Sequence, residues 1–121
     1  MKEFRMGKVE ARFADLIWAH APLTTGELVK LCLEELGWKR TTTYTVLKRL
    51  CDREIFETKD SVVTARISRQ EFYACQSEEF VEESFGGSLP AFLAAFTARK
   101  KLSQAEVEEI RRMIDACGKE G

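Results

Sequence analysis

Side chains that build catalytic and metal sites are scarce in this chain of 121 residues. It has one histidine, His20, and no CxxC pair among its four cysteines, Cys32, Cys51, Cys75 and Cys117. Zinc sites and histidine-dependent nucleophiles need several such groups at defined spacings. A glycine-rich phosphate loop is also missing. The sequence therefore predicts no catalytic residue, no metal site, no cofactor and no enzymatic activity.

Long hydrophobic runs are absent as well. No segment approaches the ~18 consecutive apolar residues that a membrane-spanning helix needs. The N-terminus lacks the apolar segment of a secretory signal peptide. We therefore expect a cytoplasmic protein without membrane insertion. The widely separated cysteines are then expected to be buried thiols and not disulfides.

The net charge of −1 conceals an uneven distribution along the chain. Residues 38–69 carry eight cations and four acids, a local charge of +4. Residues 1–37 carry five cations and six acids, and residues 70–121 carry six cations and ten acids, which gives −1 and −4. Because a local basic face is enough to attract a polyanion, the acidic pI does not exclude nucleic-acid binding.

The segment from Lys39 to Leu50 is predicted to be a helix whose first turn breaks the usual rules of helix stability. Acids are favoured at a helix N-terminus, and each exposed cation there costs ~0.3–1 kcal/mol. Lys39 and Arg40 occupy this position, and four threonines, which are poor helix formers, follow by Thr45. Phosphates bind helix N-termini, and threonine can approach base edges closely. The segment is therefore predicted to read DNA. The alternative is that it is a capped helix whose exposed face is merely solvated and contacts no partner.

The predicted contacts divide between this helix and the hairpin that follows it. Hydroxyl groups are expected at base edges and nearby phosphates, and cations along the DNA backbone. Two alternatives remain: Tyr44 stacks on its own hairpin, and Arg66 forms an ion pair with Glu57. The predicted DNA-binding residues are Lys39, Arg40, Thr41, Thr42, Tyr44, Thr45, Lys48, Arg49, Lys59 and Arg66.

Two helical patterns precede this segment, and a β pattern follows it. Apolar residues recur with helical spacing over 7–20 and 24–36, and Gly37 is typical of a helix end. The β-prone runs 55–59 and 62–67 are separated by two polar residues, as in a hairpin. We therefore predict a mainly α fold with a small β-hairpin. Residues 1–68 are expected to form a winged helix-turn-helix DNA-binding domain.

Residues 69–121 are predicted to be short helices with many apolar side chains. About fifty residues of this kind cannot easily bury such side chains alone. They either fold over the N-terminal domain or pack on a second copy. We expect a helical dimerisation domain, because two helix-turn-helix units read two half-sites of a DNA site. The predicted dimer interface is Phe80, Phe85, Leu89, Phe92, Leu93, Phe96, Val107, Ile110 and Ile114.

Several short motifs follow one another in a characteristic order between Glu10 and Ile114. They are Leu16-Ile17-Trp18, Ala21-Pro22-Leu23-Thr24, Glu27-Leu28, Gly37-Trp38, Thr41-Thr42, Thr45, Leu47-Lys48-Arg49-Leu50, Ser68-Arg69-Gln70-Glu71-Phe72, Phe85-Gly86-Gly87-Ser88-Leu89, and Leu102-Ser103 with Glu106, Glu109 and Ile110. In order and spacing they resemble the penicillinase-repressor family (BlaI/MecI/CopY type) of bacterial winged-helix repressors.

This resemblance implies a cytoplasmic homodimer that binds a palindromic double-stranded DNA operator and represses resistance or stress-response genes. In the β-lactam branch of the family, a membrane sensor-protease leads to cleavage of the repressor. Ala95-Phe96 stands here in place of the Asn-Phe cleavage dipeptide of that branch. Lys39-Arg40 replaces the usual Ser-Pro, and Glu54 occupies a position that is often glycine. The cysteine-rich motif of the copper branch is absent.

Two functions of different classes are therefore weighed. The leading hypothesis is a sequence-specific DNA-binding transcriptional repressor that acts as a homodimer. The alternative is a winged-helix module that mediates protein–protein assembly and does not bind DNA. Titration of labelled DNA from upstream of the gene distinguishes them.

Overall fold

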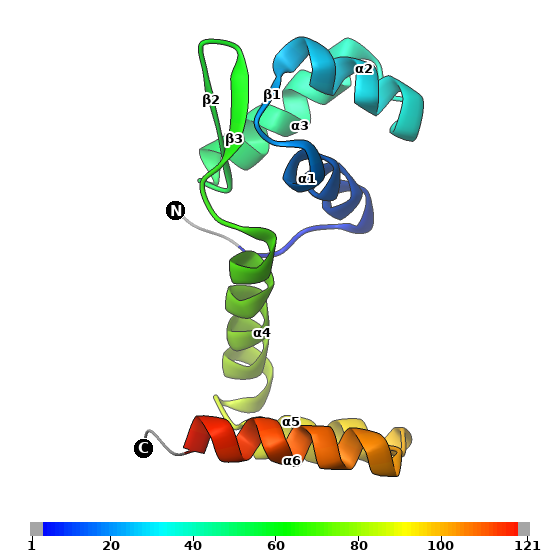
Figure 1. Ribbon diagram of the computed structural model, residues 1–121, viewed down its shortest axis with the longest axis vertical. Coiled ribbons are helices and arrows are strands. Elements are labelled where there is room, and N and C mark those ends of the chain that lie inside the picture. The colour runs from blue at the N-terminus through cyan, green and yellow to red at the C-terminus, as the bar shows by residue number, and fades with distance from the viewer. Residues whose placement is uncertain (1–3, 119–121) are drawn as a thin grey trace. The chain divides into compact units, whose positions relative to one another are not determined.

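A computed structural model describes residues 4–118 and divides into two compact units, Met1–Glu79 and Phe80–Gly121. The secondary structure is mainly helical (Figure 1). In chain order the elements are α1 (Lys8–His20), β1 (Leu23–Thr24), α2 (Thr25–Leu36), α3 (Arg40–Asp52), β2 (Phe56–Lys59), β3 (Val62–Ala65), α4 (Arg69–Phe85), α5 (Leu89–Arg99) and α6 (Gln104–Gly118).

The ends of α2 show how local sequence shapes the N-terminal unit. The Thr24 hydroxyl accepts a hydrogen bond from the Glu27 amide at 3.0 Å, and the Glu27 carboxylate accepts one from the Thr24 amide at 2.8 Å. This reciprocal pair is the predicted capping box. At the other end Gly37 has a φ of 66°, in the left-handed region where glycine is favoured. Both predicted boundaries of the helix are confirmed.

A three-stranded antiparallel sheet in the order β1-β3-β2 forms the wing (Figure 1). The predicted hairpin is present, with Thr58 opposite Val63 in its register. Asp60 and Ser61 both have positive φ, the backbone of a type I′ turn, whose twist matches that of paired strands. The strand β1 was not predicted. It is only two residues long, and its existence depends on pairing with β3.

The core of the N-terminal unit lies between the three helices and the sheet. Its largest members come from different elements, with Phe13 in α1, Leu28 in α2, Leu50 in α3 and Phe56 in β2. The partly buried Trp18 packs against this core, and its ring centroid lies 5.3 Å from that of Phe56. The winged helix-turn-helix is therefore a packed body with its own core.

The first part of α4 belongs to this N-terminal body. Phe72 is 0% exposed, and its ring centroid lies 5.6 Å from that of Trp18. Tyr73 also packs against the core. The two units consequently divide between Glu79 and Phe80, within α4, and not at the predicted boundary between residues 68 and 69.

The C-terminal unit consists of the end of α4 with α5 and α6. The predicted break at Gly86-Gly87 separates α4 from α5, and the Ser88 hydroxyl accepts from the Ala91 amide at the start of α5. Four phenylalanines gather here, with centroid distances between 5.7 and 6.1 Å. No residue between 80 and 118 is buried. A single copy of this unit therefore lacks a closed core.

Candidate nucleic-acid interface

The helix α3 has two sharply different faces. Val46, Leu47 and Leu50 point into the core, as predicted, and Thr43 joins them with an exposed fraction of 1%. Thr45 and its neighbours on the opposite face are exposed to solvent. The buried face fixes α3 against the N-terminal unit, and the other face remains available to a partner.

The exposed threonines offer different hydrogen-bonding groups. The Thr45 hydroxyl donates to the Thr41 carbonyl at 2.8 Å, so its oxygen is left as an acceptor beside an exposed methyl group. The hydroxyls of Thr41 and Thr42 have no hydrogen-bond partner among residues 4–118. Such groups can accept from base amino groups or phosphate-bound water, and threonine methyls can pack on thymine.

The N-terminus of α3 is basic and uncapped. Lys39 is the N-cap residue but makes no side-chain capping bond, and the first turn contains no acid. This contrasts with α2, whose first turn is satisfied by Thr24 and Glu27. Exposed backbone N–H groups and the positive end of the helix dipole favour an anion at this position. Together with exposed Arg40, they form a site suited to a phosphate group.

Tyr44 belongs to α3 and shares a surface hollow with the wing. The Arg40 guanidinium carbon lies 5.5 Å from the centre of its ring. Tyr44 also lines a shallow hollow of about 270 Å³ together with Thr25 and with Thr58 of β2. The ring is half-buried and makes no ring–ring contact with the wing within residues 4–118. Contact with DNA therefore remains a prediction for Tyr44.

Two of the predicted cations already have acidic partners. Lys48 forms an exposed ion pair with Asp52 at 3.2 Å, and Arg49 forms one with Glu10 of α1 at 3.2 Å. Neither acid was predicted to touch the site. The spacing of four residues between Lys48 and Asp52 is a sequence signal for a helical ion pair. No such local signal links Glu10 to Arg49, because only the packing of α1 on α3 brings them together.

Two further predicted cations lie on the wing. Lys59 ends β2 and Arg66 follows β3, and both side chains are exposed. The alternative ion pair between Arg66 and Glu57 does not occur in the described structure. Arg66 is thus available to a partner. Its backbone amide donates to the Ile55 carbonyl, which holds it in place beside the hairpin.

The Cys51 thiol of α3 lies beside the wing. Burial raises the pKa of the Cys51 thiol, which contacts the Thr58 hydroxyl. A raised pKa disfavours the reactive thiolate. Within residues 4–118, no group of three or more histidine, cysteine, aspartate or glutamate side chains is placed to hold a metal ion. The chemistry of this face is that of hydrogen bonding and charge.

In a comparison with known protein families, residues 6–116, which are most of the chain, match the family model "Penicillinase repressor". The chain belongs to the penicillinase repressor family. The penicillinase repressor of Bacillus licheniformis is a relative with 23% identity to this chain over 115 residues. The alignment covers 92% of this chain and 90% of the relative. The methicillin resistance regulatory protein MecI of Staphylococcus aureus (strain Mu50) is 20% identical over 118 residues, covering 94% and 96%.

Membership of the penicillinase repressor family agrees with the predicted class of function. Family members are DNA-binding repressors that regulate transcription. The winged helix and the separate helical unit agree with the predicted fold class. In the described part of this repressor, residues 4–118, no helix has both the length and the apolar character needed to cross a membrane.

Proposed function

We propose that this protein is a sequence-specific DNA-binding transcriptional repressor that acts as a cytoplasmic homodimer on a palindromic operator. In this proposal α3 enters the major groove, and the wing lies along the adjacent backbone. The main support is the exposed face of α3, which combines free hydroxyl groups with an uncapped basic N-terminus in a member of a repressor family.

The assignment of contacts follows from the position of each group. Thr41, Thr42 and Thr45 are the candidates for base edges, because short side chains on the exposed face allow close approach. Lys39 and Arg40 are placed to bind a phosphate at the helix N-terminus. Lys48, Arg49, Lys59 and Arg66 complete the set as backbone contacts, with Tyr44 beside them.

The homodimer is proposed because the C-terminal unit leaves its apolar side chains uncovered. Phe80, Leu89, Phe96 and Ile114 are each between 43% and 52% exposed. Exposed apolar surface of this kind is typical of a protein interface. A second copy would complete the core that one copy lacks. The proposed interface also includes the half-buried Phe85, Phe92, Leu93, Val107 and Ile110.

Resistance or stress-response genes are the proposed targets, and a membrane sensor-protease pathway is the proposed route of induction. Ala95 and Phe96, which stand in place of the Asn-Phe cleavage dipeptide of the β-lactam branch, lie in α5. Mass spectrometry of the repressor before and after β-lactam treatment of the cells tests this route. A break near Ala95-Phe96 would support this route, and an intact chain with full derepression would contradict it.

DNA binding is tested by titrating labelled duplex from upstream of the gene. Lys48→Ala and Arg40→Ala should each weaken binding and reduce the log–log salt slope by about 0.9 per lost phosphate contact. Lys30→Ala is a matched control, because Lys30 is an exposed cation of α2 outside the predicted set. Unchanged affinity and slope in both α3 variants would contradict this use of α3. A wild-type protein that binds no DNA would favour the protein-assembly alternative.

Dimerisation is tested by placing a charge in the apolar surface. Phe92→Asp and Ile110→Asp should convert the dimer to a monomer in analytical ultracentrifugation, because a buried unpaired carboxylate is strongly unfavourable. Operator affinity should fall with dimer content. Glu108→Asp is a control on the exposed surface of α6. Dimers that persist in both charged variants would place the interface elsewhere.

A further inference from the structure

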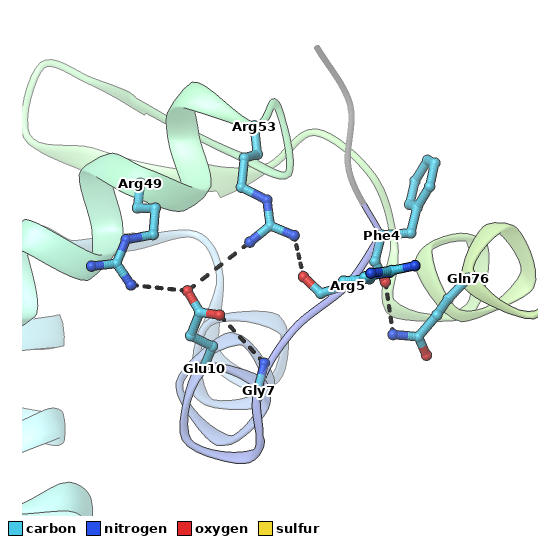
Figure 2. Close-up of polar contacts among 7 residues, drawn as sticks. All are labelled: Phe4, Arg5, Gly7, Glu10, Arg49, Arg53 and Gln76. Atoms are coloured by element: carbon cyan, nitrogen blue, oxygen red, sulfur yellow. Dashed lines mark hydrogen bonds and ion pairs between the residues drawn. The ribbon is translucent and has the colours of Figure 1, made fainter. Parts of the chain in front are cut away.

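A carboxylate of α1 lies between Arg49 of α3 and Arg53, the C-cap residue that follows α3 (Figure 2). Glu10 Oε2 accepts a hydrogen bond from Arg49 Nη1 at 3.2 Å, and Arg53 Nη1 lies 4.0 Å from the same oxygen. The other oxygen, Oε1, accepts a bond from the Gly7 amide at 3.4 Å. Glu10 therefore joins the beginning of α1 to the last turn of α3 and to its C-cap residue.

The N-terminal strap, residues 4–7, holds this arrangement from the other side. Arg53 Nη2 donates to the Arg5 carbonyl, and Gln76 Nε2 of α4 donates to the Phe4 carbonyl at 2.7 Å (Figure 2). The strap is thereby bonded to the C-cap residue of α3 and to α4. The position of Arg53 is consequently determined by several contacts and not by the carboxylate alone.

Arg49 differs from the other two charged groups in its exposure. Its side chain is 55% exposed, against 22% for Glu10 and 14% for Arg53. An exposed ion pair contributes little to stability, because water and salt screen it. The Arg49 guanidinium can therefore exchange Glu10 for an anion that is held in place beside it, whereas Glu10 and Arg53 are less exposed and more firmly held by the fold.

We propose that Glu10 is a specificity-determining residue, which holds Arg49 in the unbound protein and yields it only to a DNA phosphate that docks against the flank of α3. This inference deepens the proposed DNA binding. On non-cognate DNA no phosphate is held at that flank, so Arg49 stays with Glu10 and adds nothing to affinity. On the operator, the docked phosphate displaces the carboxylate.

The proposal has a quantitative consequence for non-specific binding. Each neutralised phosphate contributes about −0.9 to the log–log salt slope. Glu10→Gln keeps an oxygen that can accept from Gly7 but removes the charge that retains Arg49. On random-sequence duplex the slope should steepen by about 0.9 per protomer, with affinity rising up to about eightfold per protomer at 0.1 M salt. On the bound upstream fragment the slope should stay unchanged, because Arg49 is already engaged there.

The experiment measures both duplexes with wild type, Glu10→Gln, Glu10→Gln/Arg49→Ala and Asp15→Asn. Asp15 is the matched control, since it lies on the same helix and pairs at 2.8 Å with Arg69, which is outside the proposed DNA contacts. The gain on random duplex should appear in Glu10→Gln, disappear in the double variant and be much smaller in Asp15→Asn. An equal gain in Asp15→Asn would reduce the effect to net charge and overturn the proposal. Weaker binding by Glu10→Gln would also overturn it, since Glu10 would then be a structural support.

A second measurement separates this proposal from the proposed function. Elution from immobilised heparin reports the cations available to any polyanion, whether or not the protein recognises DNA. Glu10→Gln should elute at higher salt than wild type and Asp15→Asn, and removal of Arg49 should cancel the difference. If wild type binds no upstream DNA, the proposed function fails, while the heparin series still decides whether Glu10 withholds Arg49. Identical elution of Glu10→Gln and Asp15→Asn would refute that role.

Discussion

Replacement of Phe72 by alanine should destabilise the N-terminal unit, although the residue lies in the helix that continues into the C-terminal unit. Phe72 is 0% exposed and packs against Phe4, Trp18 and Tyr73, with centroid distances of 5.7, 5.6 and 5.2 Å. Truncation of a buried phenylalanine to alanine costs about 3–5 kcal/mol. A small unit has a total stability of only about 5–15 kcal/mol. The substitution should therefore remove a large part of the free energy of unfolding.

Urea unfolding followed by tryptophan fluorescence measures this effect directly. Both tryptophans, Trp18 and Trp38, lie in the N-terminal unit, so their emission reports that unit. With an m-value of about 1 kcal/mol/M for a body of this size, Phe72→Ala should lower the midpoint by roughly 3 M or leave the unit unfolded in water.

Phe80→Ala is the matched control on the same helix. Phe80 is 51% exposed and belongs to the C-terminal unit, so the tryptophan midpoint should change little. A midpoint for Phe72→Ala within 0.5 M of wild type, by an error margin of roughly half a kcal/mol, would refute the reasoning. A large shift of the tryptophan midpoint in Phe80→Ala would mean that Phe80 belongs to the N-terminal unit, and would place the division between the units later in α4.

Two further predictions concern ionisable groups. Bonds from the Thr24 backbone N–H and hydroxyl lower the pKa of Glu27 below its ordinary value of 4.5. Because the folded-state pKa is the lower one, this stabilisation is present above pH 4.5 and is lost as the pH falls through the folded-state pKa. Glu27→Gln should therefore lower the melting temperature at pH 7 but not at pH 2, and an equal loss at both pH values would contradict this. Burial raises the pKa of the Cys32 thiol, so peptide mass spectrometry after iodoacetamide treatment at neutral pH should find Cys32 modified more slowly than exposed Cys117, and faster modification of Cys32 would contradict its burial.

Several features of this protein could be predicted because their causes are local in sequence. The capping box of Thr24 and Glu27 and the glycine after α2 mark that helix without reference to any other element. The apolar spacing in α3 predicts its buried face, including the inward position of Thr43. The exposed threonines and the basic first turn lie on the part of α3 that this buried face leaves in solvent. The candidate interface was therefore predictable as a surface, although its binding to DNA remains a prediction.

Other features depend on contacts between distant segments. The pairing of β1 with β3 needs the loop after α1 to reach the wing, which two residues of β-prone sequence do not indicate. The N-terminal unit extends into α4 because Phe72 fits a space beside Trp18.

Sequence alone determined the helices, the hairpin and the exposed composition of α3, because hydrogen-bond caps, apolar periodicity and charge are properties of neighbouring residues. Only the tertiary structure decided that Arg49 has an acidic partner at this surface. Arg49 and Glu10 are separated by 39 positions, and the packing of α1 on α3 is what brings their charges within 3.2 Å. Electrostatic pairing of this kind depends on distance in space, which a local pattern cannot specify.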